Sequence, residues 1–92
     1  MSVDYEIAGR VAIVCGASTG MGFSSAMGLA KQGVNLLLIS RSEEKLQSAK
    51  ADISAQSDVD IEILPGSVSD PKLAQEAGDI ALKTWTKVDV LL

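Results

Sequence analysis

Hydrophobic positions along the chain alternate between continuous apolar runs and stretches with an apolar residue at every third or fourth position. The continuous runs are rich in Val, Ile and Leu, which is typical of strands covered on both faces. They predict strands over residues 10–16, 34–40, 59–64 and 88–92. The intervening stretches have the helical period and predict helices over residues 20–32, 41–56 and 69–87.

The predicted helices also have suitable end residues. Ser42 can cap the second helix, and Asp70 can cap the third, with Pro71 in its first turn. Gly33 follows the first helix where a helix commonly stops. The residues expected to face the core are Phe23, Ala26, Met27, Ala30, Leu46, Ala49, Ile53, Leu73, Ala77, Ile80 and Ala81.

Strands that alternate with helices across short connections predict one fold class. A parallel sheet needs crossover connections, and right-handed crossovers place helices on both faces. The chain of 92 residues is long enough for at most one small domain. The sequence therefore predicts an α/β fold built on an open parallel sheet, in the order βαβαβαβ.

The first strand-to-helix turn, "CGASTGMG", contains little besides small residues. A helix N-terminus offers unpaired N–H groups that bind phosphate, provided that side chains leave room for it. Gly16 permits the sharp turn, Gly20 lets phosphates reach the backbone, and Gly22 lets the helix pack closely on the strand; Ser18 and Thr19 can add hydroxyl donors. Two alternatives stay open at this stage, glycines that serve packing alone and a flavin-phosphate loop of the flavodoxin kind. A Walker loop is disfavoured because Phe23, not Lys, follows Gly22.

Composition and charge exclude several classes of function. The net charge is −4 and the eight Lys and Arg residues form no cluster, which argues against non-specific nucleic-acid binding. With no His and a single Cys, the sequence offers no zinc site, no Ser-His-Asp triad and no internal disulfide. No secretory signal is evident and the apolar runs are too short to span a bilayer, so we expect a cytoplasmic protein without a membrane partner.

The spacing Gly16-x-x-x-Gly20-x-Gly22 resembles the glycine motif of the short-chain dehydrogenase/reductases. Three later segments, "LLLISRSEEKL", "SVSD" and "VDVLL", are similar to further segments of that family, in order and at matching distances. The resemblance implies a Rossmann-like sheet in the strand order 3-2-1-4. It also implies that residues 1–92 are the N-terminal part of an NAD(P)-binding domain, truncated after the fourth strand. Met21 would then be one of the cofactor-binding positions.

The end of the second predicted strand bears on which cofactor is bound. In dinucleotide folds an acidic residue about 20 positions after the glycine turn holds the ribose 2′-hydroxyl. Here Ser40 stands in that place and Arg41 follows, and a guanidinium can bind the 2′-phosphate of NADP. We therefore expect NADP rather than NAD, the alternative being that Arg41 is only a solvated loop residue.

Two residues depart from the family pattern. Cys15 stands where the family usually has Thr, and it is expected to be a small buried side chain, with a reactive thiol as the alternative. Ser67 stands where the family usually has an Asp that contacts adenine. The resemblance implies that Ser67 and Val68 line the adenine pocket with fewer hydrogen bonds.

The chemistry implied by the resemblance is hydride transfer between nicotinamide and a small carbonyl or alcohol, catalysed by Tyr, Lys, Ser and Asn residues. The only tyrosine is Tyr5, and Gly9 stands four positions later where the lysine would be expected. No catalytic residue is therefore assigned. The main prediction is the dinucleotide-binding part of an NADP-dependent oxidoreductase, a homo-oligomer at full length. The alternatives are a non-catalytic NAD(P)-binding or regulatory module and a truncated product without activity.

Overall fold

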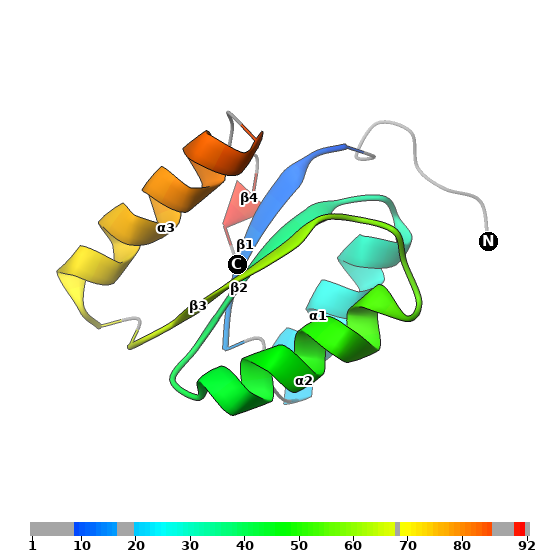
Figure 1. Ribbon diagram of the computed structural model, residues 1–92, viewed down its shortest axis with the longest axis horizontal. Helices are drawn as coiled ribbons and strands as arrows, with labels where there is room; N and C mark the ends of the chain where they lie inside the picture. Colours follow the sequence, from blue (N-terminus) through cyan, green and yellow to red (C-terminus); the bar gives the residue numbers. More distant parts are fainter. Residues whose placement is uncertain (1–8, 17–19, 68, 86–89, 92) are drawn as a thin grey trace.

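A computed structural model describes residues 9–16, 20–67, 69–85 and 90–91 of the chain (Figure 1). Strands and helices alternate through all of these residues, so the predicted order βαβαβαβ is confirmed. The elements are β1 (Val11–Cys15), α1 (Gly20–Lys31), β2 (Asn35–Ser40), α2 (Glu43–Ser54), β3 (Ile61–Pro65), α3 (Pro71–Trp85) and β4 (Val90–Leu91).

The strands form a parallel sheet in the order β3-β2-β1-β4, as predicted. Ile13 of β1 lies opposite Leu37 of β2 on one side and Leu91 of β4 on the other. Leu37 in turn lies opposite Glu62 of β3. Because the order changes direction at β1, the connections after β1 and after β3 run to opposite sides of this strand.

Helices cover both faces of the sheet, α1 and α2 on one face and α3 on the other (Figure 1). Alternate strand residues point to opposite faces, so the two central strands contribute to two separate cores. The core under α1 and α2 contains Ala12, Val14, Leu36 and Leu38, and the core under α3 contains Val11, Ile13, Leu37 and Ile39. Burial on both faces explains why these strands are continuously apolar.

The helix ends follow the predicted signals. The Ser42 hydroxyl accepts a hydrogen bond from the N–H of Lys45 at 3.2 Å, and Asp70 Oδ1 accepts one from the N–H of Lys72 at 2.9 Å. Pro71 is the first residue of α3. The predicted inward positions of α2 are buried, as are those of α3 except Ile80, which is partly buried against the same core. None of the described helices is both long enough and apolar enough to cross a bilayer.

The third strand differs from its prediction, since it runs over Ile61–Pro65 and not over residues 59–64. Asp60 belongs to the connection before it: its N–H donates to Asn35 Oδ1 at 3.0 Å, and its Oδ2 accepts from Trp85 Nε1 at 3.3 Å. The Asp60 carbonyl oxygen still accepts from the N–H of Leu36 in β2 at 2.9 Å, so only its N–H and its side chain turn to other partners. At the other end, exposed Pro65 lies opposite Ser40 and closes the strand.

Candidate functional site

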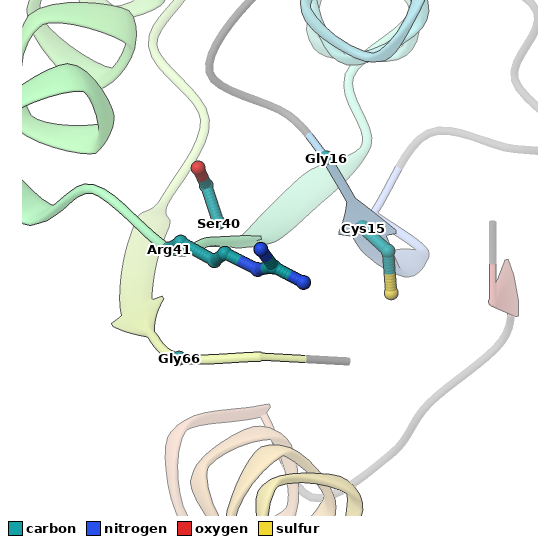
Figure 2. Close-up of a pocket in the computed structure, with 5 residues that line it drawn as sticks. All are labelled: Cys15, Gly16, Ser40, Arg41 and Gly66. Atoms are coloured by element: carbon teal, nitrogen blue, oxygen red, sulfur yellow. The ribbon is translucent and has the colours of Figure 1, made fainter. Parts of the chain in front are cut away.

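A cavity of about 470 Å³ opens at the carboxyl ends of β1, β2 and β3 (Figure 2). Its lining comes from the last residue of β1 or β2 and the residues that follow each strand: Cys15, Gly16, Ser40, Arg41 and Gly66. Parallel strands bring their carboxyl ends to the same edge of the sheet, where open α/β folds bind ligands. Three residues that the sequence singled out for binding, Gly16, Ser40 and Arg41, thus lie together around one cavity.

Gly16 and Gly20 bracket the turn between β1 and α1. Their φ angles are 66° and 61°, in the left-handed region that side chains with a Cβ rarely adopt. Apart from its chain neighbours, a Cβ built on either residue would meet no atom of the described residues within 4 Å. The described residues therefore leave open space beside both glycines, next to the N-terminus of α1. This is the geometry that an anion needs to approach backbone N–H groups.

Arg41 supplies the charge of the cavity. Its side chain is exposed, and it extends from the end of β2 across the cavity toward Cys15 (Figure 2). Within the described part of the chain, the guanidinium forms no hydrogen bond or ion pair, and the lining includes no carboxylate. In a chain of net charge −4, the described lining of this cavity is therefore positive and offers an anion a donor group that no described carboxylate pairs with.

Backbone and side-chain hydrogen bonds hold the ends of β2 and β3 together. The N–H of Gly66 donates to the carbonyl oxygen of Ser40 at 2.8 Å. The Ser40 hydroxyl oxygen is 3.5 Å from the N–H of Ser42, which caps α2. These contacts fix the backbone from which Arg41 projects.

Gly66 is a lining residue that the sequence analysis missed. A Cβ at this position would lie 2.7 Å from Cδ1 of Leu73, a residue of α3 that is buried in the core beneath this helix. The glycine therefore allows the first turns of α3 to pack against the end of β3. A glycine two positions after the predicted strand over residues 59–64 was the available signal, but the sequence does not show that α3 packs this closely.

Ser67, which is predicted to line the adenine pocket, follows Gly66 but is not among the described residues that line this cavity. Its hydroxyl is 2.8 Å from the Ser69 hydroxyl and accepts from the N–H of Ser69 at 3.3 Å. Met21 and Gly22 lie in the first turn of α1, where the Met21 side chain is 88% exposed. Ser18, Thr19 and Val68, which were predicted to bind the cofactor, lie outside the described residues.

Cys15 is a free cysteine at the end of β1, half-buried rather than fully buried. It packs partly against the core under α3 and also lines the cavity beside Arg41 (Figure 2). The thiol is the only one in the sequence. Its chemical reactivity can therefore report on the occupancy of this cavity.

Comparisons with known proteins agree with the family resemblance of the glycine motif. A family model described as short chain dehydrogenase matches residues 10–92. The very-long-chain 3-oxoacyl-CoA reductase of Kluyveromyces lactis is 48% identical over 61 residues, which are 66% of this chain and 18% of that protein. The L-rhamnose 1-dehydrogenase (NAD(P)(+)) of Sphingomonas sp. is 36% identical over 85 residues, which are 91% of this chain and 33% of that protein.

A solved structure gives the same result for the fold. The L-sorbose reductase of Gluconobacter frateurii, in complex with NADPH and L-sorbose, superposes with a TM-score of 0.88 at 26% sequence identity. The match covers 92% of this chain and 32% of the reductase. The matches thus span between 18% and 33% of the length of these relatives.

Proposed function

The chain belongs to the short-chain dehydrogenase/reductase family, and on that basis we propose that it binds NADP(H) along the carboxyl edge of its sheet, as the cofactor-binding part of an oxidoreductase. The observation that carries this proposal is the combination, around one cavity, of a glycine after β1 whose surroundings the described residues leave open and a guanidinium after β2 that pairs with no described carboxylate. The turn suits a diphosphate and the guanidinium suits a second phosphate nearby. NADP carries both groups on one molecule.

The choice of NADP over NAD rests on Arg41. NAD has a free 2′-hydroxyl, which a carboxylate at the end of the second strand recognises, whereas Ser40 occupies that place here. A guanidinium binds a phosphate through paired, charge-assisted hydrogen bonds. The sorbose reductase was solved with NADPH, which supports the same choice, although the rhamnose dehydrogenase is named for both cofactors.

The activity proposed for the whole protein is hydride transfer between the cofactor and a small carbonyl or alcohol. When bound, the nicotinamide cofactor supplies or accepts the hydride. This part of the chain would bind and orient it: the N–H groups at the start of α1 would hold the diphosphate, and Arg41 would hold the ribose that carries the 2′-phosphate. They position the cofactor and do not themselves transfer a proton.

Protection of the single thiol tests the proposal directly. We expect saturating NADPH to slow alkylation of Cys15 by iodoacetamide several-fold, because the thiol lines the cavity that the cofactor would fill. The measurement is the rate of mass increase of the intact chain with and without NADPH. NADH at the same concentration is the matched control and should protect less. An alkylation rate that NADPH leaves unchanged would argue against binding at this cavity.

Replacement of a turn glycine tests cofactor binding and folding stability by two separate measurements. Gly16→Ala places a Cβ in the left-handed region, so we expect the free energy of unfolding to fall by about 1 kcal/mol. We expect NADPH affinity to fall several-fold as well, because the new methyl group would enter space that the described residues leave open and that the diphosphate would fill. Urea unfolding and a calorimetric titration measure the two effects.

The matched control is Gly28→Ala, the same chemical change on the exposed surface of α1. An alanine in a helix interior is favoured over glycine by roughly 0.5–1 kcal/mol, so this variant should be more stable and bind normally. If both variants bound NADPH as the original chain does, the turn would have no part in cofactor binding.

A further inference from the structure

The described lining of the cavity contains one charged side chain, that of Arg41. The neighbouring Ser40 does not add a second donor beside it. The Ser40 hydroxyl oxygen lies 3.5 Å from the backbone nitrogen of Ser42, and its side chain points away from the guanidinium (Figure 2). Among the described residues, a phosphate on the ribose of a bound nucleotide would therefore be held by a single guanidinium.

The position of this guanidinium is not fixed by the described residues. Arg41 is exposed, and within the described part of the chain its side chain forms no hydrogen bond or ion pair. An arginine side chain has several rotatable bonds, whereas the backbone at this place is held by the 2.8 Å hydrogen bond from the Gly66 N–H to the Ser40 carbonyl oxygen. The guanidinium can therefore reach neighbouring phosphate positions from one fixed backbone.

Two classes of adenine nucleotide differ only in which of two neighbouring positions carries that phosphate. NADP has it on the ribose 2′-oxygen, and the 3′-phosphoadenosine 5′-diphosphates have it on the adjacent 3′-oxygen. A site that separates the two classes needs a second fixed donor or a repulsive group at one position. The described lining contains neither a second cationic side chain nor a carboxylate.

We infer that this cavity also binds 3′-phosphoadenosine 5′-diphosphates, the class to which coenzyme A belongs, with the diphosphate at the turn after β1 and the 3′-phosphate on Arg41. The inference rests on the proposed function, because it uses the same two phosphate positions. In coenzyme A, as in NADP, the phosphorylated ribose is attached to one end of the diphosphate and the rest of the molecule to the other. Coenzyme A and its thioesters therefore compete with NADPH for one site.

Coenzyme A and dephospho-coenzyme A test this inference, since they differ only in the 3′-phosphate. Each is titrated calorimetrically into the unmodified chain, with a reductant that keeps Cys15 and the ligand thiol reduced, and NADPH is titrated under the same conditions. We expect coenzyme A to bind within about tenfold of NADPH and dephospho-coenzyme A to bind at least about tenfold more weakly than coenzyme A. Saturating NADPH should abolish the coenzyme A signal.

Three results would overturn the inference and leave the proposed function intact, provided that NADPH binds tightly. They are equal affinities for coenzyme A and dephospho-coenzyme A, a coenzyme A affinity more than about tenfold below that of NADPH, and coenzyme A binding that NADPH does not abolish. Failure of NADPH to bind would overturn the proposed function, and the inference with it.

A pair of charge-removing variants shows whether Arg41 holds the 3′-phosphate. In Arg41→Ala, coenzyme A and dephospho-coenzyme A should bind within about twofold of each other, because the donor for the phosphate is gone. Lys45→Ala is the matched control: Lys45 is exposed and does not line the cavity, so this variant should keep the preference of the original chain. A preference that survives in Arg41→Ala would place the 3′-phosphate elsewhere and overturn the inference.

Discussion

Replacing Arg41 by alanine is expected to weaken NADPH binding by about tenfold to a hundredfold while NADH binding changes by less than about twofold. The reason is that the guanidinium forms no hydrogen bond or ion pair with the described residues and would meet only the extra phosphate of NADPH. A charge-assisted contact to a phosphate contributes about 1.5–3 kcal/mol, which gives the size of the effect. The measurement is a titration of each reduced cofactor against the original chain and the variant.

Lys45→Ala is the matched control for the loss of one positive charge. Lys45 is exposed in the first turn of α2 and does not line the cavity, so its removal tests the long-range field alone. We expect an effect below about twofold at physiological salt, because screening weakens charges that do not touch the ligand. An equal loss of NADPH and NADH affinity in Arg41→Ala would remove the argument for NADP.

Replacing Leu37 by alanine is expected to lower the free energy of unfolding by about 2–5 kcal/mol. Leu37 is 0% exposed in the central strand β2, where it packs in the core under α3. Its truncation leaves a cavity that the neighbouring strands cannot close without moving. Since small domains have a total stability of about 5–15 kcal/mol, this single change removes a large share of it.

The fluorescence of Trp85, the only tryptophan, follows this unfolding in urea because its side chain packs against the same core. The matched control is Leu82→Ala, the same substitution on α3 at a side chain that is 56% exposed. We expect that variant to unfold within about 0.5 kcal/mol of the original chain. Similar losses in the two variants would mean that the core under α3 contributes less than its burial indicates.

The sequence was sufficient to predict the fold because hydrophobic period and helix caps agree with each other along the chain. Each expected helix has its predicted cap or stop, and the central strands are continuously apolar because both of their faces are covered. The strand boundary near Asp60 could not be predicted from the same pattern. The N–H and the carboxylate of Asp60 form hydrogen bonds with Asn35, 25 residues earlier, and Trp85, 25 residues later. The local pattern of apolar residues does not reveal such distant partners.

The candidate site was predictable where it depends on a single strand end. Gly16 and Arg41 stand directly at the ends of their strands, so the topology alone brings them together. The contribution of Gly66 could not be predicted in this way, because it depends on how closely Leu73 of α3 approaches. The sequence likewise does not show that the Ser67 hydroxyl forms a hydrogen bond with the Ser69 hydroxyl in the same turn.

Pro65 also affects whether another strand can pair with β3 at the edge of the sheet. The N–H of Gly66 points inward to Ser40, so the nitrogen of Pro65, one residue earlier, faces outward from β3. A proline nitrogen carries no hydrogen, which removes a donor that an additional strand would need at this border. Together with the exposed carboxylate of Glu62, it opposes the addition of a strand from a second molecule along β3. Edge-to-edge association of two sheets is therefore disfavoured at this edge.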